Sequence, residues 1–189
     1  MIEAICRWRD AQWHRYDDLE GSCAMQLLKH ALDAQAADPG LGYLHVQIES
    51  FQPTPQMLAG IAPVVGMKRP DFRLTLGRGR GGRTIECKRL RLSGGLPKEY
   101  VYNGMARFVS GTYATDEPVG TMIGFLQSDS PSDVVASINT HVVSHSAMGT
   151  NHQLRRMATS WPKLDLFEST HPRVSLGIIR LEHQIVDLR

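Results

Sequence analysis

The sequence predicts an α/β protein in which helices cover a mixed central β-sheet. Two observations lead to this prediction: segments with apolar residues at helical spacing alternate with short β-rich runs, and turn signals separate them. The chain of 189 residues, of which 42% are hydrophobic, is long enough to bury a core of its own. We therefore expect residues 1–189 to form one domain.

One helix and three strands are expected between residues 17 and 92. Apolar residues recur at helical spacing after Asp17 and Asp18, either of which can cap a helix, and an Asp-Pro-Gly run ends it. Alternating and β-rich runs around a Gly-Arg turn then predict strands and a hairpin. The predicted elements are a helix over 17–37, a strand over 43–50, and strands over 71–76 and 83–92 that enclose the turn 77–82.

The rest of the chain is expected to continue this alternation. Val101, Met105 and Phe108 have helical spacing, a later apolar run suits a buried strand, and Pro131 and Ser132 open another helix. The complete order is therefore α, β, β, β, α, β, α, β, which fits helices packed on a mixed sheet. The predicted elements are a helix over 98–110, a strand over 119–127, a helix over 133–147, an irregular stretch over 149–172 and a last strand over 174–181.

Positive charge is concentrated in the expected hairpin. The segment Lys68–Arg91 contains nine Lys and Arg residues and only two acids, Asp71 and Glu86, whereas the rest of the chain contains 12 bases and 17 acids. A basic strip on a mildly acidic body indicates local contact with phosphates, and a solvated arginine-rich hairpin is the alternative. The positions of the two acids favour the first interpretation.

These two acids are expected to lie close together on neighbouring strands. Asp71 heads one strand, while Glu86 and Lys88 lie two residues apart in the next and share a face, with Cys87 pointing into the apolar layer. Paired carboxylates repel each other unless a cation lies between them, and oxygen ligands suit Mg²⁺ or Mn²⁺. An ammonium beside such an ion stabilises the charge that develops on a phosphate under attack.

With Pro-Asp at the head of one strand and Glu86-Cys87-Lys88 within the next, the sequence resembles the PD-(D/E)XK nuclease superfamily. That superfamily has the restriction-endonuclease-like fold, whose core order is α, β, β, β, α, β. The resemblance implies that Asp71 and Glu86 bind the metal through their carboxylates, that Cys87 adds its backbone carbonyl, and that Lys88 is the catalytic lysine. An ordinary hairpin with a surface Glu/Lys pair is the competing interpretation.

The resemblance covers residues 17–127, and the superfamily often adds an acid from the first helix to the metal site. Glu20 is the candidate for this acid, because it shares a helical stripe with Ala24 and Leu27 and is expected to lean toward the domain. Glu49, on the polar face of the first predicted strand, is the competing candidate. The sequence leaves the choice between these two acids open.

Five arginines are candidate contacts to a nucleic-acid backbone. Arg69 lies at the head of the hairpin, and Arg78, Arg80 and Arg83 lie at its tip, where a plain solvated turn is the alternative. Arg107, on the predicted helix behind the metal site, either holds a phosphate or forms a structural ion pair. The tip also matches the GxGxxG pattern, but a β-rich run follows it instead of a helix, so dinucleotide binding is rejected.

Three histidines in the second half of the chain have the spacing of metal ligands. His141 and His145 are four residues apart on a predicted helix, and His152 lies beyond them. Neither an HExxH motif nor a cysteine partner accompanies them, so we expect solvent-facing or capping histidines in preference to a zinc site. The sequence has no GxSxG elbow and no Walker loop either.

The expected function is that of a Mg²⁺- or Mn²⁺-dependent endonuclease that hydrolyses DNA. By the same resemblance it would act in restriction, anti-phage defence or DNA repair. A catalytically silent nucleic-acid-binding or assembly subunit with the same fold is the alternative, and the same chemistry on RNA stays open. Because the chain is too small for a separate recognition module, we expect a homodimer or a larger partner protein that recruits it.

The expected location is the cytoplasm. No apolar run approaches the roughly 18 residues that a membrane span needs, and charged residues precede any stretch that resembles a signal peptide. Cys6, Cys23 and Cys87 form no CxxC motif and cannot all pair within the chain, which fits reduced thiols. No membrane partner is expected.

Overall fold

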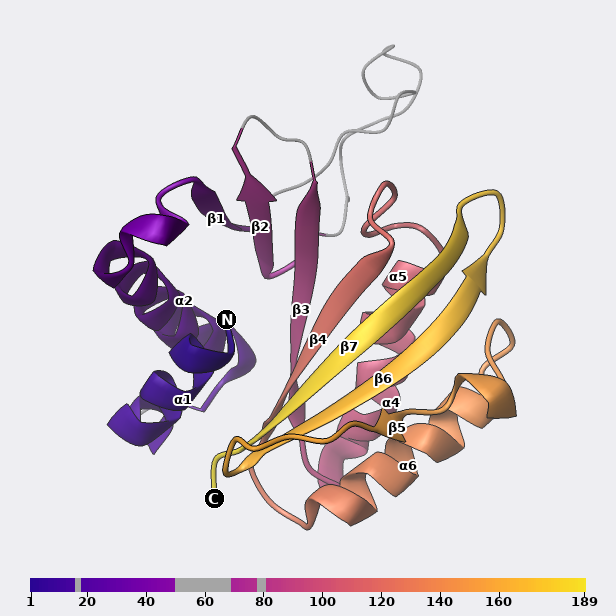
Figure 1. Cartoon of the computed structure of the whole chain (residues 1–189). Coiled ribbons are helices and arrows are strands. Elements are labelled where there is room, and N and C mark those ends of the chain that lie inside the picture. Colours follow the sequence, from indigo (N-terminus) through magenta and orange to yellow (C-terminus); the bar gives the residue numbers. More distant parts are fainter. Residues whose placement is uncertain (16–17, 50–68, 78–80) are drawn as a thin grey trace.

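A mixed seven-stranded β-sheet forms the centre of the protein (Figure 1). The computed structural model describes residues 1–15, 18–49, 69–77 and 81–189. Helices pack against both faces of the sheet, which confirms the predicted α/β class with a mixed central sheet. In the spatial order β1-β2-β3-β4-β7-β6-β5, the strands are β1 Leu44–Ile48, β2 Phe72–Leu76, β3 Gly82–Leu90, β4 Val119–Leu126, β7 Gly177–Asp187, β6 Leu164–Arg173 and β5 Arg155–Arg156.

The middle of the sheet is parallel and its two sides are antiparallel. β4 runs parallel to both β3 and β7, and every other pair of neighbours is antiparallel. β4 is buried along almost its whole length, as its continuous apolar run predicted. β2 pairs only with the first part of β3, from Gly82 to Ile85. Among the described strands, none covers the second part of β3 on that side.

Two groups of helices cover the two faces of the sheet (Figure 1). α1 and α2 pack on one face, and the helices that follow β3 and β4 pack on the other. Within the described residues, no helix is both long and apolar enough to cross a membrane. The helices are α1 Ile2–Ala11, α2 Glu20–Ala37, α4 Leu96–Glu99, the π-helix η4 Tyr100–Met105, α5 Ala106–Val109 and α6 Pro131–Ser144, with 3₁₀ turns η1 Trp13–Arg15, η2 Pro39–Leu41, η3 Ser93–Gly95 and η5 Thr150–His152.

The core under α1 and α2 joins both helices to the middle strands. Trp8 of α1 is fully buried, and its ring lies 5.1 Å from that of Phe125 in β4, measured between centroids. Ile85 and Cys87 point from β3 into the same cluster, as the strand periodicity predicted for Cys87. α1 is missing from the predicted order, because its charged residues obscure a short apolar stripe.

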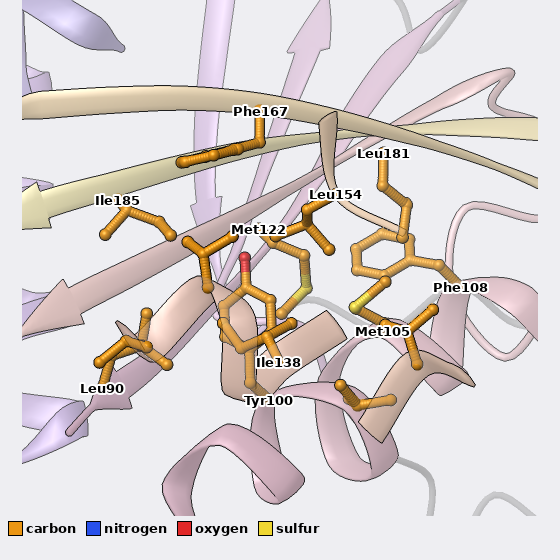
Figure 2. Close-up of a cluster of buried hydrophobic side chains, with 14 of the residues drawn as sticks. Leu90, Tyr100, Met105, Phe108, Met122, Ile138, Leu154, Phe167, Leu181 and Ile185 are labelled. Atoms are coloured by element: carbon orange, nitrogen blue, oxygen red, sulfur yellow. The ribbon is translucent and has the colours of Figure 1, made fainter. Parts of the chain in front are cut away.

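The core on the other face is larger, and Figure 2 shows its centre. Side chains from η4 and α5 meet those of β4 and β7, and α6 closes the cluster from outside. This packing explains why the helix after β3 presents its apolar side to the sheet. The labelled members include Tyr100, Met105, Phe108, Met122, Ile138, Leu181 and Ile185.

The first predicted helix begins later than expected. α2 starts at Glu20 with Leu19 as its N-cap residue and without a side-chain cap, so the expectation that Asp18 caps it is wrong. The Asp18 carbonyl instead accepts a 2.6 Å hydrogen bond from Gln127 Nε2, directly after β4. Asp17, the other candidate, lies outside the described residues. From α2 to β4 the described elements otherwise follow the predicted order α, β, β, β, α, β.

The end of the chain is more regular than predicted. The expectation of an irregular stretch over 149–172 is wrong, because β5 and most of β6 lie within it. The expected last strand over 174–181 has the wrong bounds, since residues 174–176 form the turn between β6 and β7. Positive φ angles at Ser175 and Gly177 allow this reversal. Polar side chains at buried positions of β6 obscured its strand pattern.

Candidate active site

Two carboxylates lie along the uncovered part of β3 and bind its backbone. Asp71, directly before β2, accepts the N–H of Cys87 through Oδ2 at 2.6 Å. Glu20, the first residue of α2, accepts the N–H of Arg89 through Oε2 at 3.2 Å. These two N–H groups point away from β4, where a further strand would otherwise pair. The side chains of Asp71 and Glu20 therefore take the place of a strand partner.

The ammonium of Lys88 lies among oxygen atoms at this edge. Lys88 Nζ is 2.8 Å from Glu20 Oε1, 2.9 Å from Glu86 Oε1 and 2.9 Å from the carbonyl oxygen of Cys87. Lys88 is 8% exposed and Glu86 only 1%. The structure thus brings Glu20, Glu86, the Cys87 carbonyl and Lys88 together. Asp71 joins them through its hydrogen bond with the N–H of Cys87.

Arg107 of α5 contacts the same oxygen of Glu86 that Lys88 contacts. Its Nη1 atom lies 2.6 Å from Glu86 Oε1 and donates a 2.9 Å hydrogen bond to the Tyr113 hydroxyl. Of the two roles that the sequence left open for Arg107, the structure shows the ion pair. The Tyr113 hydroxyl completes this contact.

The π-helix η4 brings the helical backbone close to Lys88. A Cβ atom at Gly104 would lie 2.5 Å from Met122 Cε and 3.7 Å from Lys88 Cγ, so a larger residue would have to displace the methionine. The helix expected over 98–110 is present, because α4, η4 and α5 follow one another without a gap, but the sequence did not predict that its middle part is a π-helix. π-Helical turns occur frequently at functional sites, and here the turn precedes Arg107.

Burial sets the protonation of the cluster. It raises the pKa of Glu86 to about 7, although the charges of Lys88 and Arg107 act in the opposite direction. Burial also raises the pKa of Asp71, and the hydrogen bond from Cys87 partly offsets this. Burial opposes the charge on Lys88, but Glu86 and Glu20 outweigh it and raise the pKa of the lysine. Lys88 is therefore a cation at neutral pH.

One of the two carboxylate oxygens of Glu86 lacks a hydrogen-bond partner among the described residues. This atom, Oε2, is buried. A buried carboxylate oxygen without a partner is costly, and such atoms in native structures call for a ligand, an ion or a water. Over the same described ranges, no three His, Cys, Asp or Glu side chains are grouped closely enough to form a ready metal site.

The candidate acids and arginines outside this cluster lie in varied places. Glu49 is exposed and follows β1, and its backbone N–H donates to the Asp71 carbonyl at 3.2 Å. Arg69 is exposed, just before Asp71 in the chain. Arg83 lies on the α1 face of β3, where it forms a 2.7 Å ion pair with Glu182. The remaining candidates, Arg78 and Arg80, lie outside the described residues.

The histidines form a buried polar chain that the sequence did not reveal. Tyr100 Oη is 2.8 Å from His183 Nδ1, and Ser169 Oγ is 2.8 Å from both His183 Nε2 and His171 Nε2. His152 stacks on His171, with 5.2 Å between their ring centroids. Strand alternation could have indicated that β6 and β7 bury these residues, had β6 been recognised. His141 and His145 are both half-buried, on and just after α6.

Fold and site together define the class: an α/β protein whose central sheet has carboxylates around a buried lysine on an uncovered strand edge. No family model, curated protein or solved structure matches the chain.

Proposed function

We propose that the protein is a metal-dependent nuclease with a restriction-endonuclease-like core that hydrolyses phosphodiester bonds in DNA. The observation that carries this proposal is the contact of Lys88 Nζ with Glu20, Glu86 and the Cys87 carbonyl, beside Asp71. Acidic ligands with an adjacent lysine suit phosphoryl chemistry, because the transition state concentrates negative charge on phosphate oxygens.

The donor set fits a hard divalent cation. Asp71, Glu86, the Cys87 carbonyl and Glu20 offer only oxygen atoms, which Mg²⁺ and Mn²⁺ prefer. Glu86 supports this fit in particular, because its Oε2 atom is buried without a partner among the described residues. When bound, such a cation supplies Lewis-acid stabilisation of phosphate charge and acidifies water. It would also relieve the repulsion between the carboxylates.

The chain's own residues contribute charge and position. Lys88 stays protonated at neutral pH, so it acts as a hydrogen-bond donor and positive charge toward a phosphate oxygen, and not as a base. Glu20 and Glu86 fix the direction of its ammonium. Arg107 also keeps Glu86 in place through its Oε1 atom and limits the rise of its pKa. Burial of the cluster excludes bulk water and strengthens each of these interactions.

Cleavage of supercoiled and linear DNA tests the proposal. The wild type would be compared with Lys88→Ala and Asp71→Asn, in Mg²⁺, in Mn²⁺ and in EDTA. Lys29→Ala is the matched control, because Lys29 lies on the exposed side of α2 and, among the residues that the structure describes, pairs only with Asp33. We expect metal-dependent cleavage in the wild type and the control, and its loss in both site variants. Circular dichroism would establish that each variant is folded.

Other results would overturn the assignment in different ways. Cleavage that persists in Lys88→Ala would exclude this site. Salt-dependent DNA binding with no cleavage in any metal would support the catalytically silent subunit instead. Cleavage of RNA but not of DNA would retain the chemistry and change the substrate.

A further inference from the structure

A second cluster of charge lies in a pocket at the end of the sheet where β7 terminates. The pocket has a volume of about 260 Å³ and lies between the end of α1, the turn before β6 and the C-terminal residues. Four cationic side chains line it against two carboxylates, which leaves an excess of two positive charges. We call it the basic pocket; its charged residues are Arg9, Asp10, Arg15, Lys163, Asp187 and Arg189.

Two of the four cations are already compensated within the pocket. Arg9 pairs with Asp10 at 2.6 Å and also donates to the Pro162 carbonyl. Arg189 Nε and Nη2 donate to the two oxygens of Asp187 at 2.8 and 2.7 Å. These two pairs engage both carboxylate side chains of the pocket, so Arg15 and Lys163 have no carboxylate there that is not already paired.

Arg15 and Lys163 are the uncompensated cations. Both are exposed, and neither side chain forms a hydrogen bond or ion pair with any residue that the structure describes. Lys163 lies near enough to Asp187 to lower the pKa of that carboxyl, although Arg189 has the larger effect. Two free cations at one pocket suit a phosphate, because an arginine binds phosphate oxygens with a planar fork and a lysine acts as a point charge.

The basic pocket is close to the candidate active site along the chain. Arg15 precedes Glu20 by five residues, and five residues span at most about 18 Å between Cα atoms even when fully extended. Glu20 in turn contacts Lys88 at 2.8 Å. A single nucleic-acid strand, which advances about 3.4 Å per nucleotide, is therefore long enough to contact both places.

We propose that the basic pocket binds a backbone phosphate of the nucleic acid, through Arg15 and Lys163, other than the phosphate at Lys88. This inference rests on the proposed function, since it takes nucleic acid as the ligand. Such a contact fixes the position of the strand and reads no sequence. It would also supply a contact to the nucleic-acid backbone from a described part of the chain. Arg83 and Arg107 do not offer such a contact, because both are held in ion pairs.

The test is the salt dependence of DNA binding in EDTA, where cleavage does not occur. Fluorescence anisotropy of a labelled 20-bp duplex would be measured at several salt concentrations for the wild type and for Arg15→Gln/Lys163→Gln. The matched control is Arg155→Gln/Lys29→Gln, which removes one arginine and one lysine from exposed positions elsewhere. Thermal melting would establish that both double variants are folded.

Loss of one phosphate contact lowers the slope of log affinity against log salt by about 0.9. We expect this change in the pocket variant and not in the control. An equal change in pocket variant and control, or no change in either, would overturn the proposal. Binding of inorganic phosphate that the pocket variant loses, with an unchanged DNA slope, would also overturn it and assign the pocket to a free phosphate. Because cleavage is not measured, absence of nuclease activity leaves this readout intact.

Discussion

Glu20 and Lys88 are 68 residues apart in the sequence and form a 2.8 Å ion pair that ties the start of α2 to β3. The second oxygen of Glu20 binds the N–H of Arg89, so one carboxylate holds both the side chain and the backbone of the strand. Glu49, the alternative acid, makes no such side-chain contact among the described residues. The geometry therefore favours Glu20 as the acid that acts with Lys88.

Replacing Glu20 is expected to destabilise the fold. Glu20→Ala leaves the buried ammonium of Lys88 with one carboxylate fewer and the N–H of Arg89 without its acceptor, at a cost of about 2 kcal/mol. Glu49→Ala is the control and should change the free energy of unfolding by less than about 0.5 kcal/mol. Urea denaturation at pH 7 measures both. Equal effects of the two substitutions would contradict the role assigned to Glu20.

Arg107 is expected to stabilise the protein through Glu86. Arg107→Ala leaves the buried carboxylate with Lys88 alone, and we expect a loss of about 2–3 kcal/mol in the free energy of unfolding. Arg107→Lys keeps the charge, but its shorter side chain places the ammonium farther from Glu86 and Tyr113, both of which Nη1 of the arginine contacts, so its loss should be intermediate. Arg155→Ala, on the exposed β5, is the control. If Arg107→Ala is as stable as this control, the ion pair contributes nothing.

Divalent cations are expected to stabilise the folded protein. A ligand that binds only the folded state at 100 times its dissociation constant adds about 2.7 kcal/mol. The melting temperature of the wild type should therefore rise with Mn²⁺ or Mg²⁺ and return to its starting value with EDTA. Asp71→Asn should lose most of this rise, whereas Asp116→Asn, at an exposed position, should keep it. A rise of the same size in Asp71→Asn would place the cation elsewhere.

The buried histidines are expected to make stability fall in acid. Burial lowers the pKa of His183 to about 3 and that of His171 to about 4, from 6.5. As the pH falls below 6.5, the unfolded chain takes up protons that the folded protein does not. Each histidine therefore lowers the free energy of unfolding by up to about 1.4 kcal/mol per pH unit, until the pH reaches its folded pKa. Above pH 7.5 neither contributes.

Urea denaturation at pH 7.5, 6 and 5 measures this dependence. His183→Gln should be less stable than the wild type at pH 7.5, because it disturbs the bonds to Tyr100 and Ser169, but its stability should depend less on pH. His45→Gln, at an exposed position of β1, is the control and should keep the dependence of the wild type. An unchanged slope in His183→Gln would show that the residue does not cause it.

The part of the fold that follows simple periodicity was predictable. β4 is a continuous apolar run and α2 has helical spacing, so both were expected within a few residues of their bounds. β6 was not, because Ser169 and His171 fill buried positions with polar side chains that bind each other, and Ser169 also binds His183 of β7. Such partners are visible only in three dimensions. The π-helix likewise has no signal in the spacing of its apolar residues.

The candidate site was predictable where it depends on local strand geometry. Asp71, Glu86 and Lys88 belong to one hairpin, and alternation along β3 places the last two on one face. The contact of Arg107 with Glu86 depends on how α5 packs, and the choice of Glu20 over Glu49 depends on where α2 meets β3. Neither relationship is contained in residue spacing. The free cations of the basic pocket depend on which neighbours pair with the available carboxylates.

The uncovered length of β3 also bears on how molecules of this protein avoid one another. An open strand edge is a template for pairing with the strand of another chain, and native proteins block such edges with charge or with side chains. Here Asp71 and Glu20 occupy the N–H groups of Cys87 and Arg89, and the ammonium of Lys88 occupies the carbonyl of Cys87. The residues that we propose to act in catalysis thus also block this edge against pairing with the strand of another chain.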